Sequence, residues 1–212
     1  MINFTDMTGL ASSVVALLAM AAQLPGVARL PRPRLALLLS AIAIAVLIPL
    51  GGLPLAAYVR GWMGDLSISS LVLLLMAVWR KLAGAPITPS PCGGGLGWGN
   101  ERDNYVFLFF ISLAALFLYP MALGIGYFDP YKLGYGGPWL LGGLLLLALA
   151  CFRRFPLIAL AIALAVFAWG VGWYESGNLW DYLLDPLLAI YAIGALLWRG
   201  VQTLLKSWRG RP

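Results

Sequence analysis

The sequence predicts an all-α fold, a polytopic transmembrane helical bundle of about seven spans. Three observations predict this fold class. First, 62% of the 212 residues are apolar and only 10% are charged, whereas soluble domains have about 45–50% and about 25%. Second, the apolar residues gather in segments of roughly the length that crosses a bilayer. Third, Lys and Arg concentrate in alternate connections. Together these features exclude a soluble globular domain and a disordered chain.

Each expected span is an apolar segment bounded by polar, Gly or Pro residues. Met1 to Asp6 contains no Lys or Arg, whereas a secretory signal begins with basic residues, so we expect the first segment to be a retained span. The third and fifth segments are shorter than the roughly 20 residues that a span usually needs. In chain order, the segments are 8–24, 35–57, 66–79, 105–126, 139–152, 155–172 and 179–198.

The boundary between the second and third spans has two interpretations. The Gly and Pro residues within 51–54 interrupt helices and could end the second span early. The third span would then begin near Leu55 and carry Arg60 and Asp65 into the membrane. Both interpretations give the same number of crossings.

Basic residues predict the orientation. With seven spans, two of the 14 basic residues, Arg60 and Lys132, fall on one side of the membrane, and twelve fall on the other. Because cytoplasmic loops are enriched in Lys and Arg, we expect the N-terminus outside and the C-terminus in the cytoplasm of a bacterial inner (plasma) membrane. The twelve are Arg29, Arg32, Arg34, Arg80, Lys81, Arg102, Arg153, Arg154, Arg199, Lys206, Arg209 and Arg211.

Residues 1–198 are expected to form the bundle, with a cytoplasmic Gly/Pro-rich loop at 82–104. Neither a preceding strand nor a Gly-Lys-Ser/Thr ending accompanies its glycines, so the loop is not a phosphate-binding motif. Residues 199–212 are predicted to form a separate amphipathic tail, because Val201, Leu204 and Trp208 recur at helical spacing among basic residues. Such a helix lies on the cytoplasmic leaflet or docks onto a partner protein.

Acidic and aromatic residues concentrate on the predicted outer face, in three short segments. We hypothesise that they form one polar, acidic site between the helices, because an ionisable group within a membrane is a functional candidate by default. The last helix is expected to begin after Asn178 and to bend at Pro186, which places Asp181 and Asp185 on one face. Arg60 or Lys132 is the expected partner of Asp185. The candidate binding residues are Arg60, Asp65, Asp129, Tyr131, Lys132, Glu175, Asn178, Asp181 and Asp185.

Helix capping is the alternative explanation for these polar residues. Asp65 could cap the third span, where the helix dipole stabilises its charge. Asp129 and Asp185 each precede a proline, which is typical of a helix start. Asn178 followed by Asp181 resembles a capping box.

Composition also limits the chemistry. The chain has no His and two Cys, so we expect no metal site and no cofactor. Since the net charge of +6 is assigned to membrane loops, nucleic acid is not an expected partner. The expected partners are membrane lipids, a membrane protein or a second copy.

Three functions fit these observations. The first is a non-catalytic accessory or assembly subunit that contacts a partner protein or a lipid head group. The second is a small transporter or flippase for a cation or an amine-bearing lipid. The third is a transferase that acts on a lipid-linked substrate through an outer-face carboxylate.

Overall fold

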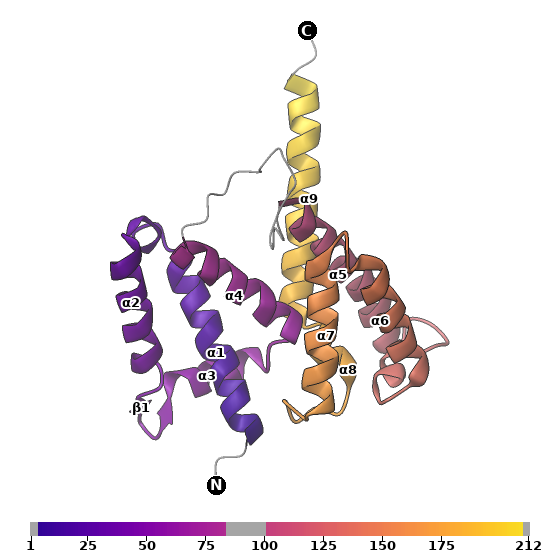
Figure 1. Ribbon diagram of the computed structural model, residues 1–212. Coiled ribbons are helices and arrows are strands. Elements are labelled where there is room, and N and C mark those ends of the chain that lie inside the picture. Colours follow the sequence, from indigo (N-terminus) through magenta and orange to yellow (C-terminus); the bar gives the residue numbers. More distant parts are fainter. Residues whose placement is uncertain (1–3, 84–100, 210–212) are drawn as a thin grey trace.

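A computed structural model describes residues 4–83 and 101–209, which are helical apart from a short hairpin and the connections (Figure 1). The predicted all-α class is confirmed. The helices are α1 (Phe4–Gln23), α2 (Arg32–Ala45), α3 (Leu55–Met63), α4 (Ile68–Ala83), α5 (Glu101–Ala122), α6 (Pro138–Cys151), α7 (Pro156–Gly170), α8 (Leu179–Leu183) and α9 (Pro186–Arg209). Strands β1 (Pro49–Leu50) and β2 (Leu53–Pro54) pair antiparallel, and the short 3₁₀ helices are η1 (Val27–Arg29) and η2 (Pro130–Gly134).

Several helices have the length and surface of membrane spans. Three described segments are long and apolar enough to cross a membrane, namely Phe4–Gln23, Arg102–Ala122 and Pro186–Lys206. Helices α6 and α7 are also apolar but have 14 and 15 residues. Large apolar side chains face outward, and Leu146 and Ile190 are each 70% exposed. Apolar surface of this kind is favourable against lipid and costly in water, so these features indicate a membrane protein.

The connection between α2 and α4 differs from both sequence interpretations. Helix α2 ends at Ala45, because the chain then turns in the β1–β2 hairpin, where Gly51 and Gly52 have positive φ angles. The helix in this region therefore ends before Gly51, as the first interpretation expects. The helix that begins at Leu55 does not continue to Trp79, however, because α3 ends after nine residues before Gly64, whose φ is also positive.

The predicted loop 82–104 is shorter than expected at both ends. Helix α4 continues to Ala83 and α5 already begins at Glu101. The rest of that segment, including Cys92, lies outside the described residues.

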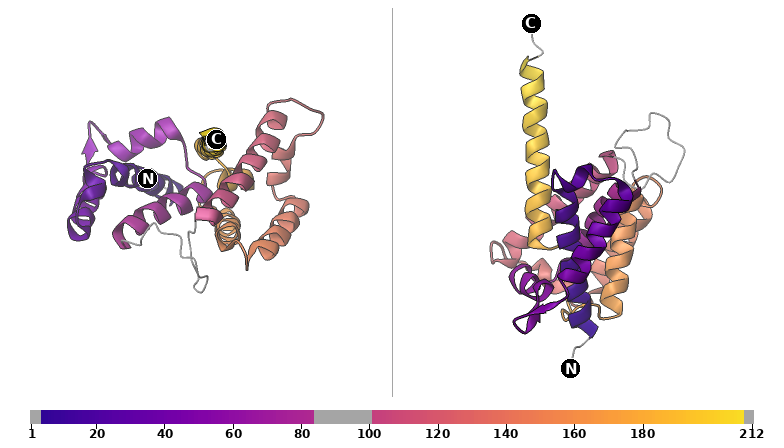
Figure 2. Two further views of the ribbon diagram at one scale, coloured as in Figure 1. Left: turned by 90° about the horizontal axis from the view of Figure 1, so that it is seen from above. Right: turned by 90° about the vertical axis from the view of Figure 1, so that its left-hand side faces the viewer.

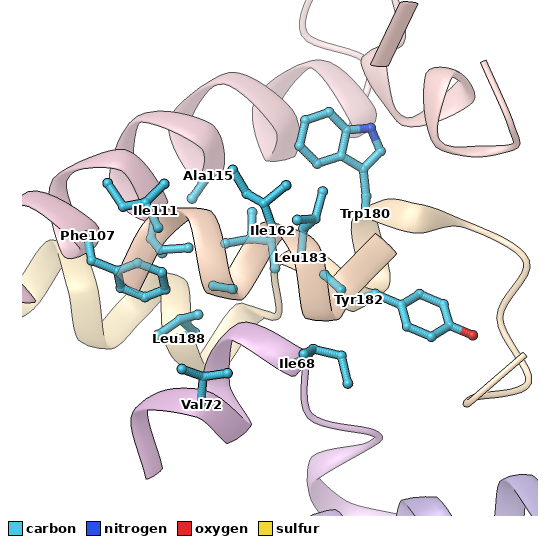
Figure 3. Close-up of a cluster of buried hydrophobic side chains, with 14 of the residues drawn as sticks. Ile68, Val72, Phe107, Ile111, Ala115, Ile162, Trp180, Tyr182, Leu183 and Leu188 are labelled. Carbon is cyan, nitrogen blue, oxygen red and sulfur yellow. The ribbon is translucent and has the colours of Figure 1, made fainter. Parts of the chain in front are cut away.

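The helices form two groups that meet along α4. Figure 1 shows α1 to α4 on one side of the molecule and α5 to α9 on the other, and the end view in Figure 2 shows the same division. Helix α4 packs against α1 in its own group and against α7 and α8 in the other. The main core lies within the group formed by α5 to α9, and Ile68 and Val72 of α4 pack against it (Figure 3). Its other residues include Phe107, Ile111, Ala115, Ile162, Tyr182, Leu183 and Leu188.

Helix α9 contradicts the prediction of a separate tail. It continues unbroken from Pro186 to Arg209, which is 24 residues or about 36 Å at 1.5 Å per residue. Its lower end lies part-way along the bundle, and its C-terminal part extends beyond the other described helices (Figures 1 and 2). Arg199 does not end the helix, and its guanidinium lies over the Tyr105 ring of α5. Residues 210–212 lie outside the described part.

Candidate functional site

The carboxylate of Asp185 joins the N-terminal ends of α4 and α9. It accepts hydrogen bonds from the Ser67 backbone N–H at 3.0 Å and the Ser67 hydroxyl at 2.7 Å. The Ser70 hydroxyl and the Leu188 backbone N–H, the latter at 2.8 Å, also donate to it. Asp185 is only 6% exposed. Hydrogen-bond donors and helix N-terminal dipoles both stabilise a carboxylate, so this arrangement compensates a buried negative charge.

The local sequence explains why two helices begin at this point. Ser67 caps α4, because its hydroxyl accepts a hydrogen bond from the Ser70 backbone N–H at 3.2 Å. Leu184 has an extended backbone, which ends α8 after five residues. Pro186 then starts α9, and proline is favoured in the first turn because its missing N–H has no partner there. Both helices therefore begin inside the bundle.

Two predictions about Asp185 are wrong. The described groups that bind its carboxylate are serines and a backbone N–H of helix N-termini, not Arg60 or Lys132. Asp181 does not share a helical face with Asp185, because the chain is extended between them. The alternative interpretation, that Asp185 and Pro186 start a helix, is confirmed.

Arg60 holds a second polar group. This arginine belongs to α3, which lies in the lower part of the molecule in Figure 1. Its guanidinium binds both oxygens of Asp65, at 2.7 and 3.1 Å, and one oxygen of Asp6 at 3.1 Å. A carboxylate oxygen of Glu175 lies 4.0 Å away. The hydrogen bonds that Arg60 donates to Asp65, aided by the one to Asp6, raise the pKa of Arg60 above its usual value. Asp65 is therefore an ion-pair partner and not the cap of α4, a role that Ser67 has.

This ion-pair group requires glycine at position 9 of α1. A Cβ atom on Gly9 would lie 2.2 Å from Nε of Arg60 and 2.5 Å from a carboxylate oxygen of Asp65. Because Gly9 has no side chain, Arg60 of α3 and Asp65 of the following loop can lie directly against α1.

Asp181 belongs to a third group, which fixes the connections beside α8. It accepts hydrogen bonds from the Tyr131 hydroxyl at 2.9 Å and from the Ser176 hydroxyl. Burial and the bond to Asp181 raise the pKa of Tyr131. Asn178 caps α8 through the Trp180 backbone N–H at 3.0 Å and donates to the Tyr131 carbonyl at 2.9 Å. The prediction that Asn178 caps a helix is confirmed, but Asp181 does not complete a capping box.

The remaining candidates have minor contacts. Asp129 caps η2 by accepting from the Tyr131 backbone N–H at 3.0 Å, as the capping interpretation predicts. Lys132 is exposed. The hydrogen bonds of the predicted residues thus form separate groups around Asp185, Arg60 and Asp181, and not the single polar site that we expected.

Sequence reasoning missed several participants in these groups. Asp6, which binds Arg60, is not among the predicted binding residues. Ser67 and Ser70 carried a usable signal, since hydroxyls at the start of an apolar segment are typical of a helix cap. No sequence pattern indicates the role of Gly9, because that role depends on a contact with the distant residue Arg60.

Comparison of the chain with protein-family models, curated proteins and solved structures found no match.

Removing the Asp185 carboxylate should destabilise the fold strongly. Asp185→Ala leaves four donors without their acceptor, and we expect it to lower the free energy of unfolding by about 3–5 kcal/mol. Asp185→Asn keeps one acceptor oxygen and should cost less. The measurement is denaturant unfolding in a mild detergent. The control is Asp129→Ala, which removes a single cap and should cost about 1 kcal/mol. Equal losses for Asp185→Ala and the control would contradict the assigned role.

Gly9→Ala should separate the Arg60 ion-pair group from α1. The added methyl group would overlap Arg60 and Asp65, and we expect a loss of about 1–3 kcal/mol in the same unfolding experiment. Gly61→Ala on α3 is the matched control, because its Cβ would meet nothing within 4 Å. A Gly9→Ala protein as stable as this control would show that the close approach is not required.

Proposed function

We propose that this chain is a seven-span integral protein of a bacterial inner (plasma) membrane and serves as a non-catalytic accessory or assembly subunit. In this proposal α1, α2, α4, α5, α6 and α7 each cross the membrane once. Helices α8 and α9 together form the seventh crossing, which is interrupted at Asp185. Helix α3 is too short to cross and lies at the outer surface.

The positions of the basic residues support the orientation. Arg29, Arg80 and Arg154 belong to helix ends or connections that lie at the upper end of the bundle in Figure 1. Arg60 and Lys132 belong to α3 and η2, towards the opposite end. Since cytoplasmic loops are enriched in Lys and Arg, the upper end is the cytoplasmic one, and both the start of α1 and the three polar groups belong to the outer half.

The observation that supports the proposed role is that these polar side chains are bound by other groups of the protein. Asp185 is bound by four donors, and Asp181 is bound by two hydroxyls. Arg60 is bound by Asp65 and Asp6. Groups held in this way stabilise one helix arrangement, whereas a general base or a nucleophile needs access to a substrate.

Large exposed side chains that could contact a partner at the outer end are mostly aromatic. Trp62 and Tyr58 lie one turn apart on α3 and are 83% and 52% exposed. Tyr135 and Trp139 are 64% and 84% exposed near the start of α6. Aromatic side chains are enriched both in protein interfaces and at the head-group level of membranes. We therefore assign partner or head-group contact to this surface.

A small transporter or flippase is the second candidate, and one observation favours it. Helices α4 and α9 begin inside the bundle and direct their N-termini at a buried carboxylate. Interrupted helices of this kind form substrate and ion sites in many transporters.

The orientation predicts which cysteines react in intact cells. A cysteine introduced by Gly177→Cys should be labelled by a membrane-impermeant maleimide, because this position lies on the outer side. Native Cys92 should react only after the cells are opened. If only Cys92 were labelled in intact cells, the proposed orientation would be wrong.

The accessory role predicts a discrete protein contact at α3 and no lipid transport. A photo-cross-linking amino acid at Trp62 should give a specific protein adduct in cells, whereas the same group at Leu146, on the apolar surface of α6, should give lipid adducts. Reconstituted wild-type protein should not accelerate the exchange of fluorescent phosphatidylethanolamine between leaflets. Exchange that is lost in Asp185→Asn and retained in Asp129→Asn would favour the flippase instead.

A further inference from the structure

Aromatic rings hold three arginines at the end of the bundle opposite the Arg60 group. Arg102, in the first turn of α5, and Arg154, in the connection before α7, both approach the Phe155 ring, at 5.8 and 5.9 Å from its centroid. Arg199 of α9 lies over the Tyr105 ring at 3.5 Å. Tyr105 is three residues after Arg102 and therefore on the same side of α5. Guanidinium groups from three parts of the chain are thus oriented by cation–π contacts.

None of these three arginines forms an ion pair with a described carboxylate. Among the described side chains, carboxylates lie within ion-pair distance of Arg60 only. Arg102 and Arg154 converge on one ring although like charges repel. The N-terminus of α7 adds positive potential beside them and has no side-chain cap. This concentration of positive charge favours an anion.

We propose that this end of the molecule binds the phosphate group of an anionic lipid between α5 and the start of α7. Arg102 and Arg154 are exposed, so they can reach a phosphate without rearrangement, and the planar guanidinium matches phosphate oxygens. The neighbouring Phe152 and Leu149 are 68% and 65% exposed and offer apolar surface to acyl chains. Free phosphate could bind to the same arginines, but it would make no use of the adjacent apolar surface. The combination of cations and apolar surface therefore favours a lipid.

The test measures lipid binding to the full chain in mild detergent by native mass spectrometry. Wild-type protein should bind phosphatidylglycerol more tightly than phosphatidylcholine. R102Q/R154Q should weaken phosphatidylglycerol binding by about tenfold, whereas R29Q/R34Q, with the same loss of charge at the same end of the bundle, should change it less than twofold. Phe155→Leu keeps every charge but removes the ring, and should weaken binding by about twofold to threefold.

Two results would overturn the proposal. An equal loss in R29Q/R34Q and R102Q/R154Q would mean a diffuse attraction to positive charge. Displacement of phosphatidylglycerol by millimolar inorganic phosphate would mean that the site selects phosphate and not a lipid. Because binding is read in detergent, the result does not depend on the sidedness or the partner proposed above, so either proposal can fail alone.

Discussion

The buried carboxylate of Asp185 is the constraint on which the arrangement of helices depends. A charge at this depth is costly unless donors surround it, and the N-termini of α4 and α9 supply four of them. Both helices must therefore begin inside the bundle. This requirement explains the short α8 and the extended Leu184 before α9. Because α4 belongs to one helix group and α9 to the other, the same bonds hold the two groups together.

The Arg60 group constrains the packing of α1 and α3 in a complementary way. Arg60 and Asp65 flank the end of α3, and Asp6 lies in the first turn of α1. Their contact across Gly9 fixes α3 against α1. The Thr8 hydroxyl donates to the Trp173 carbonyl, and Phe4 packs edge-on against the Trp173 ring. These contacts join the first helix to the connection between α7 and α8 through polar and aromatic side chains.

Hydrophobic segments predicted most helices, because a run of apolar residues between polar or Gly/Pro residues depends only on local sequence. The helix cap at Asp185 was also local, since proline follows it. What failed was the assumption that a helix ends where charge begins. Arg199 lies over Tyr105, and α9 continues past it. The distant partners, Ser67 for Asp185 and Asp6 for Arg60, could not be predicted, because no local pattern encodes a contact between segments that are far apart in sequence.

The arginines at the two ends of the bundle have different partners, carboxylates at one end and aromatic rings at the other. This difference bears on function. At the Arg60 end, the arginine is bound by Asp65 and Asp6, so a ligand there would have to break bonds that hold the helices together. At the other end, arginines rest on aromatic rings, which orient a guanidinium without neutralising it. An anion can therefore bind them at little structural cost. In the proposed function, partner contact at the Arg60 end is therefore assigned to exposed aromatic residues such as Trp62 and not to the ion-paired side chains.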